Sequence, residues 1–271
     1  SLLGISFYKG TYQQCLDGIR GDINNNTSQL VVTPNPEMLY DASHDSELLE
    51  VLKNAPLALP DGAGIFVAYQ IAESRLPSFL KYIAFPLWCL RAVIHNASFV
   101  KKYGERITGS RLTRDLIVYA AEMKIPVTII DPVVNDDSAG DRAKKASQET
   151  MKKSLEEKFP GLVCQVIISD SISEISKSPN LQIPDHGIIF ATHGNGKQEK
   201  LLSEVVKKYP QCGLCMGIGG SIDLITGFRQ PAPAFFQRFG GEWLYRLYKN
   251  PSRHWKRMKK VMSFLLGQIT V

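Results

Sequence analysis

Long apolar runs are missing from this sequence of 271 residues. No stretch holds 18 uninterrupted apolar residues, and the uncharged run 82–90 is far too short to cross a bilayer. The pattern therefore excludes a helix that spans a membrane by itself. Cysteine is scarce as well: the five cysteines are an odd number and are dispersed along the chain. That usage indicates a reducing compartment rather than a framework of disulfides.

The usual signatures of metal and dinucleotide sites are also missing. Cys212 and Cys215 have the spacing of a zinc or redox pair, but no second pair lies at zinc-ribbon distance, so we expect buried thiols. His193 has no second His or Cys at ligand spacing. The glycine-rich stretch 194–196 lacks the third glycine of a dinucleotide fingerprint, because Glu199 stands there. We therefore expect neither a metal ion nor a cofactor.

Negative charge is absent from the C-terminal end of the chain. The chain has 32 bases and 26 acids, and its whole positive surplus follows Glu242, where bases and large apolar side chains are interleaved. Such a mixture suits an anionic membrane surface better than a nucleic acid. The alternative is an amphipathic helix packed on the body with its charged face in water. The bases are Arg246, Lys249, Arg253, Lys256, Arg257, Lys259 and Lys260.

Short apolar runs flanked by Pro, Gly and Asp alternate with longer amphipathic segments. Such runs are typical of the buried strands of a mainly parallel sheet, and the alternation predicts an α/β fold with a Rossmann-like sheet and flanking helices. We expect a catalytic core over 1–230 and a basic helical appendage over 231–271. The strand runs are 29–33, 56–60, 126–131, 163–169, 187–192 and 213–218, and helical patterns include 36–53, 111–124, 141–159 and 197–208.

One apolar segment, 75–104, disturbs this alternation. It is rich in large apolar side chains and is interrupted by Pro77 and Pro86. We interpret it as a buried helical hairpin or a dimer surface, since most such side chains are packed. A lip that dips into lipid is the third alternative.

Polar residues cluster after the expected strands, where open α/β sheets bind ligands. Asn35 and Pro36 are predicted as the N-cap and the first residue of a helix. Asp61 ends a strand next to Gly62, so its carboxylate could take the proton of an attacking hydroxyl. Capping of the following helix is the alternative role for Asp61.

Taken together, the sequence motifs at these corners are specific. They occur in the order seen in the WecG/TagA/CpsF glycosyltransferases, glycosyltransferase family 26, which the chain resembles over nearly its whole length. The motifs are Thr33-Pro-Asn-Pro-Glu-Met, Pro60-Asp-Gly, Glu105-Arg-Ile-Thr-Gly109, Lys197-Gln-Glu199, Gly217-Ile-Gly-Gly-Ser-Ile-Asp223 and Gly241-Glu-Trp-Leu-Tyr-Arg-Leu247.

The resemblance implies an inverting, metal-independent hexosyltransferase of cell-surface polysaccharide or teichoic acid synthesis. Family members move a hexose, here of the N-acetylmannosamine type or a related one, from a nucleotide diphosphate sugar, with UDP expected as the nucleotide. The acceptor is a sugar on polyprenyl diphosphate. The expected location is cytoplasmic and peripheral, on the inner face of the cell membrane. We expect no nucleic-acid partner and leave a homo-oligomer open.

The resemblance also assigns roles to residues of this chain. Asp61 matches the catalytic base, and Arg106 is the second residue expected to act in catalysis. Substrate-binding positions are Thr33, Asn35, Gln198, Gly219, Gly220 and Asp223, and the appendage would bring Arg246, Arg253 and Lys256 to the diphosphate.

Some features depart from the family pattern, and two other functions compete with sugar transfer. The insert 75–104 lengthens the gap before Arg106, and Lys256 makes a weaker diphosphate fork than an arginine would. One rival function is a catalytically inactive peripheral membrane or nucleic-acid binding module. The other is a nucleotide-dependent oxidoreductase, which the missing glycine fingerprint disfavours.

Overall fold

The computed structural model describes residues 2–25, 27–94, 97–133, 148–177, 183–233 and 242–270. Contacts between residues divide the chain into two compact units. The first unit contains Ser1–Cys15, Thr33–Thr108 and Gln230–Val271, and the second contains Leu16–Val32 and Gly109–Arg229. The appendage expected over 231–271 is thus packed within the first unit.

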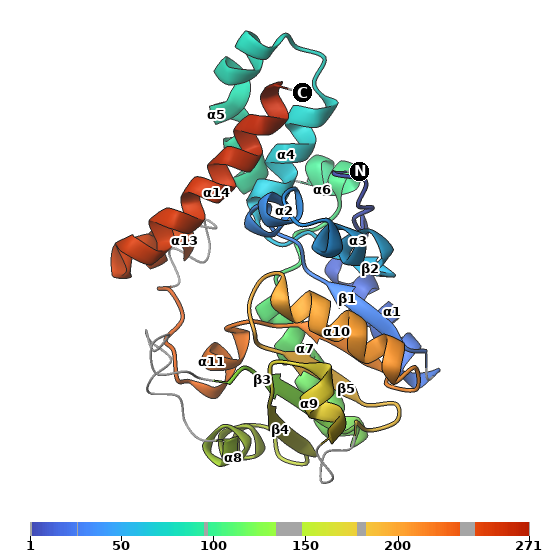
Figure 1. Cartoon of the computed structure of the whole chain (residues 1–271). Coiled ribbons are helices and arrows are strands. Elements are labelled where there is room, and N and C mark those ends of the chain that lie inside the picture. Colours follow the sequence, from blue (N-terminus) through green and yellow to red (C-terminus); the bar gives the residue numbers. More distant parts are fainter. Residues whose placement is uncertain are drawn as a thin grey trace. The chain divides into compact units, whose positions relative to one another are not determined.

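The second unit is built on parallel strands that start at the same level. The strand order across the sheet is β2-β1-β6-β5-β3-β4. Its parallel strands, in this order after β2, are β1 (Gln29–Val32), β6 (Leu214–Gly217), β5 (Ile188–Ala191), β3 (Val127–Asp131) and β4 (Cys164–Ile168). Leu214 lies opposite both Gln29 and Ile188, and Val127 lies opposite both Ile188 and Cys164. The carboxyl ends of these strands therefore form one edge, as Figure 1 shows for β3, β4 and β5.

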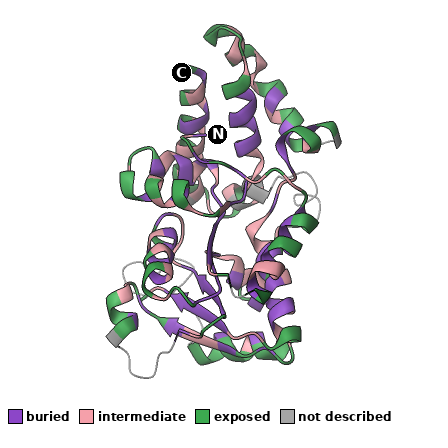
Figure 2. Cartoon of the chain, turned by 90° about the vertical axis from the view of Figure 1, so that its right-hand side faces the viewer, coloured by how far each residue is buried: buried purple, intermediate pink, exposed green. Residues whose placement is uncertain are grey.

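Helices cover this sheet. α10 (Lys197–Lys208) packs on β1, β5 and β6, α8 (Gln148–Lys158) packs on β4, and α11 (Ser221–Thr226) packs on α7 (Gly109–Met123). All residues of β1, β3, β5 and β6 are buried, whereas the edge strand β4 is buried only in part. Figure 2 shows the buried strands, and helices lie over their apolar side chains. α1 (Tyr12–Asn24) and α9 (Ile172–Lys177) complete the described helices of this region.

The first unit is mainly helical. Its elements are β2 (Leu57–Ala58), α2 (Pro36–Ala42), α3 (Ser46–Asn54), α4 (Ala63–Glu73), α5 (Ser78–Ile94), α6 (Ala97–Tyr103), α13 (Glu242–Lys249) and α14 (Pro251–Thr270). α14 packs on α2, α4 and α5, and α4 packs on α5 (Figure 1). Phe264, Leu265 and Ile269 of α14 are buried together with Ile65 and Phe66 of α4. Part of the apolar content of the basic tail therefore serves packing, as the amphipathic-helix alternative predicted.

The predicted elements agree with the structure at most positions. All six strand predictions are confirmed to within two residues at each end, and 197–208 is a helix over its full predicted range. The helix predicted over 36–53 is two helices, because Asp45 accepts a hydrogen bond from the Leu48 amide and so begins α3. Of the helix predicted over 141–159, residues before 148 lie outside the described part of the chain.

The burial expected for segment 75–104 is wrong for one face of α5, although Phe99 and Tyr103 of α6 are buried, and the dimer-surface alternative stays a prediction. Trp88 and Ala92 are the buried residues of α5, whereas Phe79, Ile83 and Leu87 are more than half exposed. The expectation of buried thiols at Cys212 and Cys215 is confirmed, with the Sγ atoms 3.6 Å apart. Within the described ranges, no helix combines the length and the apolar character that crossing a bilayer requires.

Candidate active site

The turn between β1 and α2 forms a rigid corner of the first unit. Thr33 is buried, and Asn35 is the N-cap of α2, with its Oδ1 accepting a hydrogen bond of 2.9 Å from the Met38 amide. Pro36 is the first residue of the helix. Both local predictions are confirmed. The ring of Pro36 sets the backbone angle that a helix needs, while the Asn35 side chain satisfies an amide that has no partner within the helix.

Asp61 lies against this corner. Its amide donates a hydrogen bond of 3.2 Å to the carbonyl of Pro34. Gly62 has a φ of 85°, which glycine adopts without strain, and it is the N-cap of α4. A Cβ on Gly64 would lie 2.5 Å from Cγ of Pro36, so a glycine there lets α4 approach α2 closely. The alternative in which Asp61 is the N-cap of the following helix is therefore wrong.

Arg106 belongs to a segment that is fixed to the N-terminal residues of the same unit. Glu105 accepts a hydrogen bond of 2.7 Å from the Tyr12 amide at the start of α1, and its own amide donates to the Gly10 carbonyl at 3.1 Å. Arg106 follows directly and is half-buried. Glu105 thus stabilises the start of α1, where a negative charge is favourable. Sequence reasoning did not assign this role, because Glu105 and Tyr12 are 93 residues apart in the chain.

The appendage helix α14 is held to α2 by two ion pairs. Nε and Nη2 of Arg257 each lie 2.6 Å from Oε2 of Glu37, and Nζ of Lys260 lies 2.7 Å from Oδ1 of Asp41. Arg257 precedes Lys260 on α14, and their partners Glu37 and Asp41 follow in the same order on α2. The two helices therefore run in the same direction. Residues one turn before Arg257 therefore lie toward the end of α2 where Asn35 stands. Sequence reasoning assigned no role to Glu37, although it belongs to the first motif.

Three predicted diphosphate-binding bases lie on the appendage. Lys256 is exposed on α14. Arg246 lies on α13 and Arg253 on α14, four residues before Arg257, but their side chains are outside the described part of the structure. In the described tail, two bases are thus paired with acids of α2 and Lys256 is directed to solvent.

In the second unit, Gln198 links two glycine turns. Its Oε1 accepts hydrogen bonds from the amides of Gly194, at 3.2 Å, and Gly219, at 3.1 Å. The side chain is buried, and a Cβ on Gly217 would lie 2.4 Å from its Nε2. Gln198 therefore fixes the turn after β5 relative to the turn after β6, and a glycine at 217 makes room for it.

Glu199 is a second buried member of this arrangement, and sequence reasoning gave it no role. Its Oε2 accepts a hydrogen bond of 2.7 Å from the Gly196 amide, and its Oε1 accepts one of 2.8 Å from Nε2 of Gln198. Burial raises the pKa of this carboxyl to about 7, and the two hydrogen bonds oppose that shift. The sequence signal was available, since an acid three residues after an N-cap is typical of a capping box.

The turn after β6 presents Gly219, Gly220 and Asp223. Gly219 has a φ of 47°, and Gly220 is the N-cap of α11, which has Asp223 in its first turn. Nη2 of Arg229 donates a hydrogen bond of 2.7 Å to the Gly220 carbonyl, and the Arg229 amide donates one of 2.8 Å to the Asp223 carbonyl. Arg229 thus adds an exposed cation to this turn, and sequence reasoning missed it.

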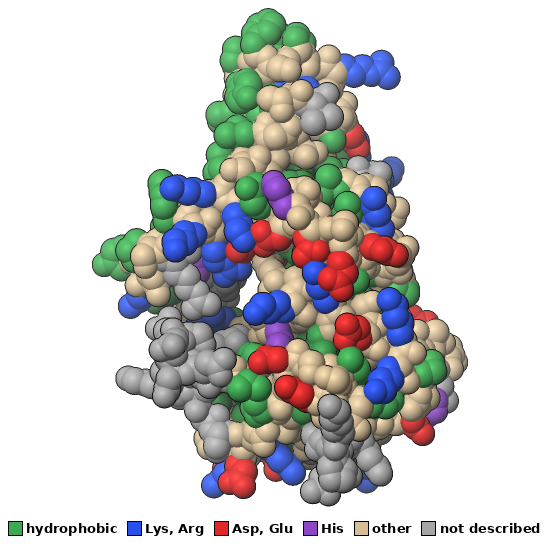
Figure 3. All heavy atoms as spheres, viewed as in Figure 1, with side chains coloured by type: hydrophobic (Ala, Val, Ile, Leu, Met, Phe, Trp, Pro, Cys, Tyr) green, Lys and Arg blue, Asp and Glu red, His purple; other side chains and the backbone are tan. Residues whose placement is uncertain are grey.

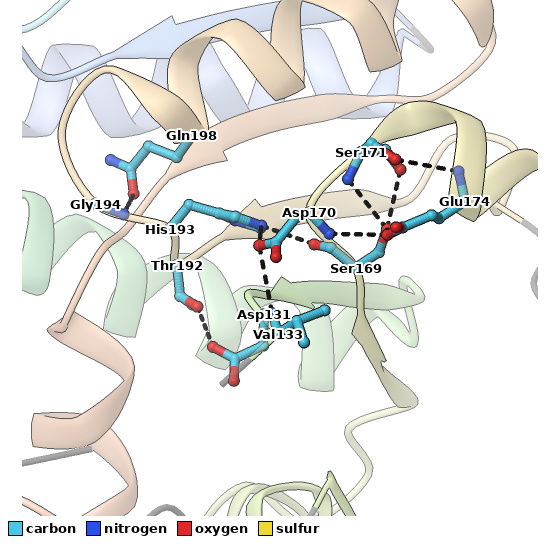
Figure 4. A network of polar contacts seen from close by, with 10 residues as sticks. All are labelled: Asp131, Val133, Ser169, Asp170, Ser171, Glu174, Thr192, His193, Gly194 and Gln198. Carbon is cyan, nitrogen blue, oxygen red and sulfur yellow. Dashed lines mark hydrogen bonds and ion pairs between the residues drawn. The ribbon is translucent and has the colours of Figure 1, made fainter. Parts of the chain in front are cut away.

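A network of polar groups lies at the carboxyl ends of β3, β4 and β5 (Figure 4). The Thr192 hydroxyl donates to Oδ1 of buried Asp131. Nε2 of His193 lies 2.7 Å from the Ser169 carbonyl and 3.4 Å from Oδ1 of Asp170. These contacts fix the chain where β5 leads into the first glycine turn, at the edge where parallel sheets bind ligands.

The pKa of Glu199 predicts a pH dependence of stability. The native carboxyl keeps its proton up to a pH of about 7, whereas in the unfolded chain it ionises near 4.5. Between these pH values the native state binds more protons, so this group lowers the free energy of unfolding as pH rises, by about 1.4 kcal/mol per pH unit. Above pH 7 its effect is constant.

Urea unfolding of the wild type and of Glu199→Gln at pH 5, 6 and 7.5 measures how much Glu199 changes the free energy of unfolding with pH. Because the amide does not titrate, the wild type should lose stability relative to the variant as pH rises, on the order of 3 kcal/mol in total. Glu204→Gln on the exposed side of α10 is the matched control and should follow the wild type. Equal slopes for wild type and Glu199→Gln would contradict the raised pKa.

Comparison with known proteins agrees with this geometry. The model of the family described as "Glycosyl transferase WecG/TagA/CpsF family" matches residues 1–95 and 88–270. A protein of Bacillus spizizenii named N-acetylglucosaminyldiphosphoundecaprenol N-acetyl-beta-D-mannosaminyltransferase is 26% identical over 246 residues, which is 90% of this chain and 79% of the relative. A Bacillus subtilis protein of the same name is 24% identical over 247 residues, 90% of this chain and 80% of the relative.

The match covers both units, including the Asp61 corner, the glycine turns and the appendage. The relatives are named as transferases of an N-acetylmannosaminyl group to a sugar carried on a polyprenyl diphosphate. This chain therefore belongs to the WecG/TagA/CpsF family of glycosyltransferases.

Proposed function

We propose that this protein is an inverting hexosyltransferase. It moves an N-acetylmannosamine-type sugar from a nucleotide diphosphate sugar, with UDP as the nucleotide, to a sugar on polyprenyl diphosphate. The observation that carries this proposal is the family match along nearly the entire chain. The names of the relatives supply the transferred sugar and the lipid-linked acceptor.

In the proposed reaction, Asp61 acts as the general base. Its carboxylate takes the proton of the acceptor hydroxyl while the hydroxyl oxygen bonds to the anomeric carbon, and the nucleotide diphosphate leaves from the opposite face, which inverts the centre. Support comes from the contact of Asp61 with the Pro34 carbonyl, since it holds the candidate base beside Thr33 and Asn35. A rigid corner of this kind suits a group that must be positioned for proton transfer.

Positive side chains would neutralise the charge that develops on the departing diphosphate. We assign this role to Arg106 and to the appendage bases Arg246, Arg253 and Lys256, because guanidinium groups bind phosphate oxygens in pairs. The Glu37–Arg257 ion pair supports the assignment, since it draws α14 to the corner that carries Asn35. By family resemblance, Gly219, Gly220 and Asp223 bind the nucleotide, and Gln198 positions their turn.

We also propose that the protein works as a peripheral protein on the inner face of the cell membrane. A polyprenyl acceptor is embedded in lipid, so the enzyme must reach the membrane surface. The basic residues after Glu242 suit anionic headgroups.

Turnover with a panel of nucleotide sugars tests the proposed function. The protein is incubated with UDP-linked and other nucleotide-linked hexoses and a short-chain polyprenyl diphosphate acceptor that carries N-acetylglucosamine. Release of the nucleotide together with formation of a β-linked disaccharide lipid is expected for a UDP-linked N-acetylhexosamine. Salt-sensitive lipid or nucleic-acid binding without turnover of any donor would instead favour the inactive binding module.

A further inference from the structure

α5 carries a continuous apolar surface that the proposed chemistry does not use. Its exposed large side chains recur at the three- and four-residue spacing of one helix face. Ile83 is 72% exposed, Phe79 66% and Leu87 56%. The apolar stripe of α5, as we call this surface, consists of Phe79, Tyr82, Ile83, Leu87, Leu90, Val93 and Ile94, with Leu76 just before the helix.

The space-filling view shows these apolar groups gathered along one side of the first unit, over α5 (Figure 3). Further exposed aromatic side chains, Tyr248 and Trp255, lie on α13 and α14 of the same unit. Soluble proteins seldom expose so many adjacent large apolar side chains unless the surface meets a partner or a membrane. The stripe is therefore a docking surface.

The charges around the stripe indicate what docks there. No Asp or Glu occurs between Glu73 and Glu105, whereas the same segment holds five bases: Arg75, Lys81, Arg91, Lys101 and Lys102. Lys102 is paired with Glu73, so the segment keeps a surplus of bases over acids. A surface with net positive charge is complementary to anionic phospholipid headgroups. A symmetric contact with a second copy would bring these cations close to their own equivalents, which disfavours that occupant.

A small cavity opens at the C-terminal end of the stripe. It has a volume of about 190 Å³ and is lined by Arg91, Ile94, Ser98, Phe99, Lys102 and Tyr103. Ile94 belongs both to the stripe and to the cavity, so apolar and cationic surfaces are continuous there. Lys102 is paired with Glu73 at 2.7 Å, and the Tyr103 hydroxyl donates to the same carboxylate at 3.0 Å. Arg91 and Ser98 are therefore the groups of this lining that suit a phosphate.

We propose that α5 lies in the interface of an anionic phospholipid bilayer, with the apolar stripe among the acyl chains and a lipid phosphate in the cavity beside Arg91. This inference rests on the proposed function, because the proposed acceptor is embedded in a membrane. It names the surface through which the enzyme binds that membrane. The apolar residues at the end of α14 cannot serve in its place, because Phe264, Leu265 and Ile269 are buried within the unit. An interfacial helix with one apolar face and flanking bases has the required properties.

Co-sedimentation with vesicles tests this inference. The double variant Ile83→Glu/Leu87→Glu changes two exposed positions and should bind at least tenfold more weakly to vesicles of phosphatidylglycerol and phosphatidylcholine. The matched control is Val163→Glu, which alters a residue of the second unit that is 56% exposed, and it should bind as the wild type does. Arg91→Glu should weaken binding to these vesicles but not to phosphatidylcholine alone.

Undiminished vesicle binding by the double variant would overturn the inference. The inference would also be overturned if the wild type were a dimer that the double variant converts to monomers while vesicle binding persists, since the stripe would then be a contact between copies.

Sugar transfer to a short-chain, water-soluble acceptor separates this inference from the proposed function. The double variant should keep the wild-type rate on that acceptor and lose at least tenfold on a vesicle-embedded one. A wild-type protein that binds vesicles but transfers no sugar to either acceptor would remove the proposed function alone.

Discussion

Replacing Asp61 with Asn should lower kcat for sugar transfer by about 10³-fold, because general-base catalysis by a positioned side chain contributes roughly 10²- to 10⁴-fold. The amide has nearly the shape of the carboxylate but cannot accept the proton of the acceptor hydroxyl. The hydrogen bond to Pro34 comes from the Asp61 backbone, so the corner should keep its structure. KM for the nucleotide sugar should change little, since the lost interaction forms in the transition state.

Steady-state transfer assays and thermal unfolding of the same preparations measure these effects. Glu47→Gln removes one negative charge from the first turn of α3 in the same unit and should leave kcat within twofold of the wild type. A folded Asp61→Asn protein that retained a tenth or more of the wild-type rate would remove Asp61 from the role of base.

Reversing the charge at Arg257 should have the second largest effect. Glu37 is mostly shielded from water, and in Arg257→Glu it would face another carboxylate instead of a guanidinium group. Breaking a shielded pair of this kind costs about 2–4 kcal/mol. Because α14 also carries bases proposed to bind the diphosphate, we expect the transfer rate to fall by about 10²-fold along with the melting temperature.

Two further variants make this prediction specific to the Glu37 contact. Lys260→Glu alters the more exposed pair with Asp41 and should cost less than about 1 kcal/mol and little activity. The swap Glu37→Arg/Arg257→Glu restores an ion pair and should recover part of the activity, although a base in the first turn of α2 is unfavourable. If Arg257→Glu and Lys260→Glu behaved alike, the Glu37 contact would have no special role in holding the appendage.

Features that depend on neighbouring residues could be predicted from the sequence. The strands were found because short apolar runs between Pro, Gly and Asp have few alternatives in an α/β protein. The Asn35 cap was found because its side chain satisfies an amide three residues away. The break between α2 and α3 was missed, although it is also local, because Asp45 was not recognised as a second N-cap.

The candidate site could be predicted in part. The motifs identified Asp61, but its place beside the β1–α2 turn depends on a hydrogen bond to Pro34, 27 positions earlier in the chain. Gln198 was expected to bind substrate. Its hydrogen bonds to the turns after β5 and β6 could not be predicted, because those turns meet only in the folded sheet. Glu37 was missed because its partner, Arg257, lies far away in the sequence. Glu199 was missed although its capping-box signal is local, because its burial depends on folding. Arg229 was missed because its contacts with Gly220 and Asp223 form only when the turn after β6 folds.

The sequence by itself determined the α/β class, the positions of the strands, the family and the basic character of the tail, because each of these follows from composition or from residues close along the chain. Only the tertiary structure decided which apolar faces are covered. Similar periodic patterns occur in α5 and α14, yet Phe264, Leu265 and Ile269 of α14 are buried while the stripe of α5 is exposed. α14 packs on α2, α4 and α5. The physical reason is that burial of a helix face depends on partners distant in sequence, as with Arg257 and Glu37, and local spacing does not contain that information.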